Sequence, residues 1–176
     1  MKVYFATHST TKDNENNIAS GWDNAELSAL GIQQSKKLKG AFENIKIDMI
    51  CCSDLRRSLE TEKLSFRGSL PVIIDKRLRE VNYGDFNGKP KDIVEKMKIE
   101  RIDLPFPKGE SFNEAIARVQ EFFKELQNKY KREEKTILVI GHRATQYGLE
   151  TLISGKTVEE CLNTPFKWQP YWEYNL

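Results

Sequence analysis

The chain has only two histidines, His8 and His142, and each directly follows a run of apolar residues. His8 follows "VYFAT" and His142 follows "TILVIG", two segments whose β-branched and aromatic residues favour strands. In open parallel sheets, ligands bind outside the carboxyl ends of the strands, where the strand order reverses. We therefore expect both imidazoles to face one crevice.

Three roles suit a histidine at such a position. Each ring could be a partly buried structural side chain, although two histidines at equivalent strand ends weaken this interpretation. Each could be a metal ligand, but the chain has no H-x-E or H-x-x-x-H spacing and no cysteine near either histidine, so we expect neither metal nor cofactor. The third role is nucleophilic attack on phosphorus through a covalent phosphohistidine.

A histidine that attacks phosphorus needs donors for the three phosphoryl oxygens, because negative charge is spread over them. Arg57 in "SDLRRSLET" is the best candidate, since it begins a predicted helix and its guanidinium can bind phosphate with two parallel hydrogen bonds. Its neighbour Arg56 is expected on the surface. Asn14 adds an amide donor, and Glu80 is a candidate proton donor to the leaving group.

The arrangement of apolar runs predicts an α/β fold, a three-layer sandwich with a mostly parallel central sheet and helices on both faces. Strand-like runs alternate with segments of helical periodicity, and the runs are "KVYFATH", "DMICCS", "PVIID" and "TILVIGH". Helices are expected over 28–42, 54–64, 111–134 and from 143 onward. In the first of these, Leu30, Leu38 and Phe42 are expected to be buried.

Residues 80–109 are rich in glycine and proline, which is typical of segments that cap a pocket. Tyr83, Phe86, Phe106 and several lysines of this segment are candidates for contacts with a leaving group. The terminal "PYWEYNL" is expected to form either a last strand or an aromatic contact surface.

Composition indicates one globular domain over residues 1–176. The net charge of +2 favours neither nucleic acid nor a membrane surface as a partner, and no apolar run is long enough to span a membrane. Three cysteines without metal-site spacing, and an N-terminus without a leader pattern, suggest buried thiols in a cytoplasmic protein. The oligomeric state stays open.

Several motifs, in order from Val3 to Ser154, resemble those of the histidine phosphatase superfamily, also called phosphoglycerate mutase-like. They are "THSTTKDN", "GWDNAELSALG", "SDLRRSLET", "LREVNYGDFNG", "FPKGESF" and "ILVIGH". The resemblance implies the sandwich fold of that family. It also implies that His8 is phosphorylated, that His142 and Arg57 hold the phosphoryl group, and that Glu80 is the general acid.

The chain departs from the family at Thr7, where the family has an arginine beside the nucleophile. A threonine hydroxyl brings one donor and no charge, and one lost donor costs about a hundredfold to a thousandfold in rate. We still expect the Thr7 hydroxyl to contact the phosphate. Arg143, directly after His142, is the first hypothesis for compensation, and Lys12 is the second.

The predicted function is a metal-independent phosphomonoester hydrolase that acts on a small phosphorylated metabolite through phosphohistidine at His8. The chain is shorter than mutase members of the family, whose extra segments exclude water, and this places phosphoglycerate mutase behind phosphatase. Thr7 keeps a further alternative open, a catalytically weak relative that binds phosphorylated ligands or a protein partner.

Overall fold

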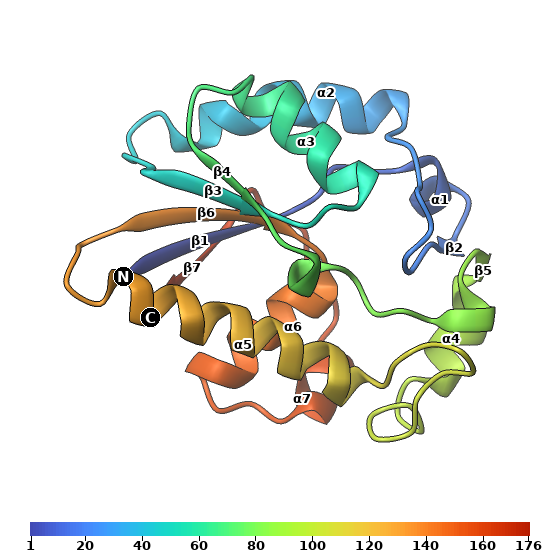
Figure 1. Cartoon of the computed structure of the whole chain (residues 1–176). Coiled ribbons are helices and arrows are strands. Elements are labelled where there is room, and N and C mark those ends of the chain that lie inside the picture. The colour runs from blue at the N-terminus through green and yellow to red at the C-terminus, as the bar shows by residue number, and fades with distance from the viewer.

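The computed structural model describes all 176 residues, and a five-stranded sheet lies at its centre (Figure 1). The strand order in this sheet is β4-β3-β6-β1-β7, and a separate two-stranded sheet pairs β2 with β5. The strand bounds are β1 Lys2–Thr7, β2 Ile18–Ala19, β3 Met49–Cys52, β4 Val72–Ile74, β5 Lys89–Pro90, β6 Thr136–Gly141 and β7 Trp172–Asn175.

Four strands of the central sheet are parallel, and β7 runs antiparallel to β1 at the edge. The register pairs Thr7 with Gly141, so that β1 and β6 end side by side. The two residues that follow these strand ends are His8 and His142. The structure thus confirms the four predicted strands, and it resolves the alternatives for "PYWEYNL" in favour of a strand.

Helices cover both faces of the sheet, with α2 and α3 on one side and α5, α6 and α7 on the other (Figure 1). The α-helix bounds are α1 Lys12–Glu15, α2 Ala29–Leu38, α3 Arg56–Phe66, α4 Lys91–Met97, α5 Phe112–Tyr130, α6 Arg143–Ile153 and α7 Val158–Asn163. Short 3-10 helices are η1 Lys39–Phe42, η2 Lys76–Leu78 and η3 Gly84–Phe86. The three-layer sandwich expected from the sequence is the observed fold.

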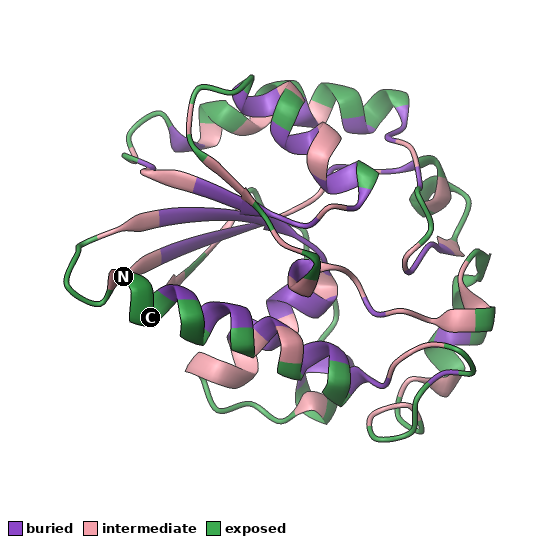
Figure 2. Ribbon diagram, viewed as in Figure 1, coloured by how far each residue is buried: buried purple, intermediate pink, exposed green.

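Two apolar cores hold the layers together, one on each face of the sheet (Figure 2). Strand residues point alternately to the two faces, so Val3 and Phe5 pack under α5 whereas Tyr4 and Ala6 pack under α2 and α3. The three cysteines are buried and unbonded.

Helix α5 begins with a capping box, in which the Ser111 hydroxyl accepts from the backbone N–H of Glu114 and the Glu114 carboxylate accepts from that of Ser111. The prediction for α2 was wrong at Leu30, whose side chain is 49% exposed. The buried face of α2 is formed instead by Gly31 and Ser35. Gly31 lies against the backbone of Thr10, where a Cβ atom would be 1.9 Å from the carbonyl oxygen, so small residues occupy this contact and Leu30 turns outward.

The segment after η2 leaves the sandwich and folds beyond the carboxyl ends of the strands, together with α1, β2, β5 and α4 (Figure 1). A third apolar core fixes it there, and this core includes Val81, Val94, Phe106 and Phe112. Phe106 is fully buried and packs edge-on against Tyr83. The region beyond the strand ends is therefore an ordered cap, and its core is shared with α5, α6 and α7.

Candidate active site

A cavity of about 700 Å³ opens at the carboxyl edge of the sheet, between the strand ends and the cap. Its two ends differ in character. The part that we call the histidine end is lined by Thr7, His8, Thr10, Asn14, Arg57, Glu80 and His142. The part that we call the aromatic end is lined by Val94, Glu95, Lys98, Arg143, Tyr147, Leu162, Asn163, Thr164, Pro165, Phe166 and Trp168.

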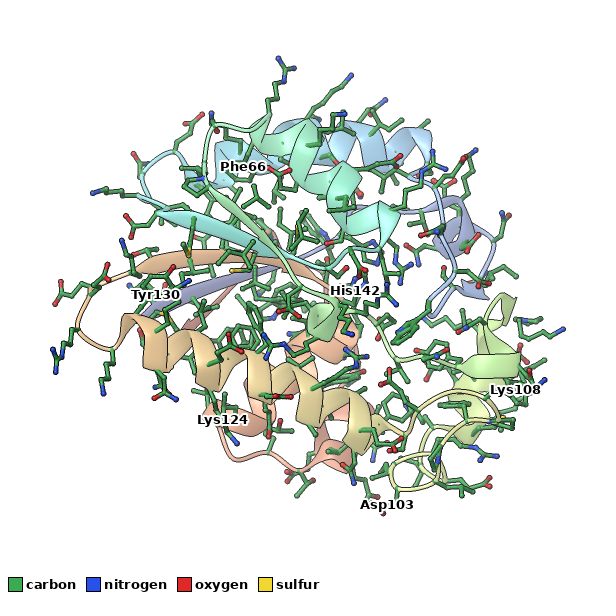
Figure 3. The ribbon with its side chains drawn as sticks, viewed as in Figure 1. Phe66, Asp103, Lys108, Lys124, Tyr130 and His142 are labelled. Carbon is green, nitrogen blue, oxygen red and sulfur yellow. The ribbon has the colours of Figure 1, made fainter.

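The two histidine rings lie together at the histidine end, with centroids 5.0 Å apart. Figure 3 shows His142 near the centre of the molecule, where the sheet ends between the two helical layers. The rings lie together because β1 and β6 end side by side, and each histidine is the residue after the last one of its strand. The prediction that both imidazoles face one crevice is confirmed.

His8 is held as a neutral ring whose in-plane lone pair lies on Nε2. Its Nδ1 lies 2.8 Å from the carbonyl oxygen of Ser9, and because a carbonyl only accepts, Nδ1 carries the proton. Its Nε2 accepts a hydrogen bond from Arg57 Nε at 3.3 Å. Burial, together with the charge of Arg57, lowers the pKa of His8 to about 3. At neutral pH, Nε2 is thus an unprotonated nitrogen suited to nucleophilic attack.

Arg57 is buried, with 2% of its surface exposed, and lies in the first turn of α3. Its guanidinium donates to the backbone carbonyls of Gly21 at 2.7 Å and Asp23 at 3.0 Å. Gly21 has a φ of +50°, and a Cβ atom there would lie 1.9 Å from Asn87 Oδ1, so this turn requires glycine. Three of the five guanidinium N–H groups are occupied, which leaves two for an anion beside His8.

His142 is 1% exposed, and its Nε2 lies 2.7 Å from the hydroxyl of Ser53. Ser53 Oγ also accepts from the backbone N–H of Leu55 at 3.3 Å. We assign the Ser53 hydroxyl as the donor to Nε2, which places the ring proton on Nδ1. Nδ1 has no partner within the protein, and such a buried polar atom is available to a ligand. Burial lowers the pKa of His142 well below its usual value.

The carboxylate of Glu80 lies at the N-terminus of α6, the helix that begins directly after His142. Its Oε2 accepts from the backbone N–H of Arg143 at 3.2 Å, and its Oε1 from those of Ala144 at 3.1 Å and Val81 at 2.9 Å. The positive end of the helix dipole favours an anion there. Glu80 is therefore brought to the histidine end, as predicted.

Two further predicted residues line this end of the cavity. Thr7 is half-buried at the end of β1. Asn14 lies in α1, where its Oδ1 accepts from the backbone N–H of Thr11 at 3.0 Å. Its amide Nδ2 is thereby left as a donor, which is the role that the sequence suggested.

The two candidates for compensation of Thr7 have other partners. Lys12 forms an exposed ion pair with Glu26 and does not line the cavity, so that hypothesis was wrong. Arg143 lines the cavity, but its guanidinium donates to Gln146 Oε1 at 2.6 Å and to the carbonyl of Thr164 at 3.4 Å. Neither histidine is among its partners in this conformation.

The sequence did not reveal the aromatic end. Tyr147, Phe166 and Trp168 follow the last recognisable motif, and only the packing of α6 and α7 beside the cap brings them to the cavity. Tyr83 of the cap lines the cavity as predicted, whereas Phe86 and Phe106 belong to the cap's core and do not. The sequence predicted a helix from 143 onward, but it could not show which side chains of that helix reach a ligand.

No group of three histidine, cysteine, aspartate or glutamate side chains is arranged to hold a metal ion. None of the helices combines the length and the apolar character that a membrane span needs.

The sequence matches the Histidine phosphatase superfamily (branch 1) over residues 3–167, so the chain belongs to this family. A Hydrogenobacter thermophilus protein that bears the name of a phosphoserine phosphatase is 26% identical in an alignment 171 residues long, and the match covers 92% of this chain and 83% of that protein. The 2,3-bisphosphoglycerate-dependent phosphoglycerate mutase of Methylobacterium sp. (strain 4-46) is 30% identical in an alignment 174 residues long, and the match covers 89% of this chain and 82% of the mutase.

Solved structures share the fold. The alpha-ribazole phosphatase from Shigella flexneri superimposes with a TM-score of 0.78 at 26% identity, and the match covers 92% of this chain and 83% of that one. Together with the family match, the relatives named as phosphatases identify the chain as a phosphatase of the histidine phosphatase superfamily. The typical mechanism of this family passes through phosphohistidine.

Proposed function

We propose that the residues of the histidine end carry out hydrolysis of a small phosphomonoester, with His8 as the nucleophile. The observation that supports this most directly is the state of the His8 ring. Its proton is held on Nδ1 by the Ser9 carbonyl, and its Nε2 lone pair lies beside Arg57 and the His142 ring. The two N–H groups left on Arg57, the Nδ1–H of His142 and the amide of Asn14 then hold the phosphoryl oxygens.

In the first step, His8 Nε2 attacks phosphorus while the bond to the leaving oxygen breaks, and Glu80 transfers a proton to that oxygen. The proton that Glu80 gives up here is the one that it takes from water in the second step. In the second step, water attacks phosphorus, Glu80 accepts the water proton and the P–N bond breaks. Inorganic phosphate leaves and His8 returns to its neutral state.

The test is hydrolysis of p-nitrophenyl phosphate in excess chelator by the wild-type protein and by His8→Ala. We expect turnover by the wild type and a loss of at least about a thousandfold in the variant. Mass spectrometry of acid-labile phosphate after rapid mixing should locate the modification on His8. Arg56→Gln, on the exposed face of the same helix as Arg57, is the matched control. Turnover unaffected by His8→Ala, or phosphate on another residue, would contradict the proposal.

Thr7 supports a second candidate function, in which the protein binds phosphorylated ligands with little turnover. No hydrolysis by either protein, together with calorimetric binding of a phosphomonoester, would favour that candidate. The relatives named as mutases make phosphoryl exchange between phosphoglycerates a further assay, in which exchange faster than phosphate release would indicate a mutase.

A further inference from the structure

At the aromatic end of the cavity, Arg143 is surrounded by aromatic rings and neutral hydrogen-bond acceptors. The guanidinium of Arg143 lies over the ring of Tyr147 at 4.7 Å and over the ring of Phe166 at 5.0 Å, measured to the ring centroids. We call these three residues the arginine bracket. Its hydrogen bonds to Gln146 and Thr164 involve neutral acceptors only. Aromatic contacts and neutral acceptors hold the side chain in place without cancelling its charge.

The missing acidic partner sets Arg143 apart from the other partly buried arginines. Arg77, Arg79, Arg101 and Arg118 each form an ion pair with a carboxylate. The arginines that line the cavity, Arg57 and Arg143, form none. For Arg57 the absence is explained by the phosphoryl dianion that the proposed function places there. The same reasoning assigns a second anion to Arg143.

The position of Arg143 shows which part of a substrate this anion belongs to. Its own backbone N–H donates to the carboxylate of Glu80, the proposed proton donor to the leaving oxygen. Its guanidinium extends from that point to Thr164 and Phe166, toward the aromatic end. At this end of the cavity Glu95 is paired with Lys98 at 3.3 Å, so Arg143 provides an unpaired positive charge. An anion bound there is carried by the leaving group.

We propose that Arg143 is a specificity-determining residue that binds a carboxylate of the leaving group, so that the preferred substrates are phosphate esters of small hydroxy acids or hydroxy amino acids. The proposal rests on the proposed phosphatase activity of the same site. A guanidinium binds a carboxylate through two parallel N–H bonds, and the bracket fixes its plane before the substrate arrives. The phosphoryl group meanwhile binds at the histidine end.

The decisive experiment compares substrates that differ by the carboxylate alone. Phosphoserine and phosphoethanolamine form one such pair, and 3-phosphoglycerate and glycerol 3-phosphate form another. For the wild type we expect kcat/KM to be at least about tenfold higher for the carboxylate member of each pair. In Arg143→Gln this ratio should fall at least about tenfold, mainly through KM, because the contact is made in the ground state as well as in the transition state.

Two variants accompany Arg143→Gln. Arg143→Lys keeps the charge but loses the pair of parallel N–H donors. We expect this variant to keep part of the wild-type preference in kcat/KM for the carboxylate substrate. Arg132→Gln, in the exposed loop before β6, is the matched control and should keep the wild-type ratio. A ratio unchanged in Arg143→Gln, with both substrates slowed equally, would overturn the proposal and assign Arg143 to the phosphoryl group. A wild-type preference for phosphoethanolamine or for aryl phosphates would overturn it as well.

A binding measurement separates this proposal from the proposed hydrolysis. Calorimetric titration of His8→Ala and of His8→Ala/Arg143→Gln with phosphoserine and phosphoethanolamine needs no turnover. We expect the double variant to lose at least about tenfold more affinity for phosphoserine than for phosphoethanolamine. Equal losses would refute the role of Arg143 whether or not the protein is a hydrolase. Absence of turnover with a selective loss of affinity would instead refute only the hydrolysis.

Discussion

The histidine end and the aromatic end of the cavity are built by different means. At the histidine end, backbone groups hold the functional side chains: a carbonyl orients His8, two carbonyls hold Arg57, and three N–H groups hold Glu80. At the aromatic end, side chains hold one another at the rim, where Phe166 is 48% exposed and Trp168 is 62% exposed. A backbone carbonyl or N–H group stays in place whichever side chain its residue carries. The geometry of the histidine end is therefore fixed by the fold.

The two ends therefore suit different roles, the histidine end the reaction at phosphorus and the aromatic end the selection of the leaving group. Groups that act on phosphorus need positions accurate to a fraction of an ångström, and strand ends with buried partners supply that accuracy. Groups that contact the leaving group vary with the substrate. Half-buried side chains on α6 and exposed ones after α7 can be exchanged at lower cost to the fold than the buried groups of the histidine end. Mutations at the two ends are therefore expected to have effects of different kinds.

The largest effect is expected for Arg57→Gln. Removal of the charge and of the paired donors beside His8 should lower kcat/KM by at least about a thousandfold, because an arginine on a transferring phosphoryl group is worth that much or more. The loss should be equal for substrates with and without a carboxylate. Arg56→Gln, one residue earlier, serves as the control, and thermal unfolding of both variants checks their folding. A loss that depended on the leaving group would show that Arg57 does not act on the phosphoryl group alone, and that the two ends do not have separate roles.

Glu80 lies where the two ends meet, so its variant should depend on the leaving group in a different way. Glu80→Gln should slow hydrolysis of alkyl phosphates about a hundredfold, since an alkoxide must be protonated as it leaves. A nitrophenolate leaves without protonation, and the loss for p-nitrophenyl phosphate should be at least about tenfold smaller in the burst phase of a rapid-mixing experiment. Equal losses in the burst would show that Glu80 is not the proton donor.

Sequence could predict the histidine end because its members belong to short motifs at predictable strand and helix ends. His8, Arg57 and His142 each follow a recognisable strand, and the parallel sheet brings those ends to one edge. It could not predict the partners of Arg143, because Phe166 reaches the cavity only through the packing of α7. It also misplaced Leu30, since a close contact between helix and backbone leaves no periodic signal.

Thr7 offers a way to sharpen the comparison by a gain of function. Thr7→Arg introduces a second cation beside the nucleophile, and we expect kcat/KM to rise at least about tenfold for all phosphomonoesters alike. Thr7→Gln, similar in length but neutral, should give no gain. The measurement is steady-state hydrolysis of p-nitrophenyl phosphate and phosphoserine by the three proteins. No gain from Thr7→Arg would mean that Arg57 and the neutral donors already satisfy the phosphoryl oxygens.

The smallest expected effect concerns stability in acid. His8 has a folded-state pKa of about 3, whereas an unfolded histidine titrates near its ordinary value of 6.5. Above pH 6.5 the ring is neutral in both states and contributes no pH dependence. Between pH 6.5 and 3 only the unfolded chain takes up the proton, so the free energy of unfolding falls as the pH falls, by about 1.4 kcal/mol per pH unit for one histidine. His142 acts in the same direction.

Urea unfolding at pH 6.0, 5.5 and 5.0 measures this slope. His8→Asn removes one proton uptake, so its stability should fall less steeply than that of the wild type, by about 1.4 kcal/mol per pH unit. Carboxylates titrate in both proteins, and the difference between the slopes isolates His8. Tyr147→Phe, at the aromatic end, should keep the wild-type slope. If His8→Asn kept it too, His8 would titrate normally in the folded protein, and the histidine end would not hold the neutral nucleophile that its geometry indicates.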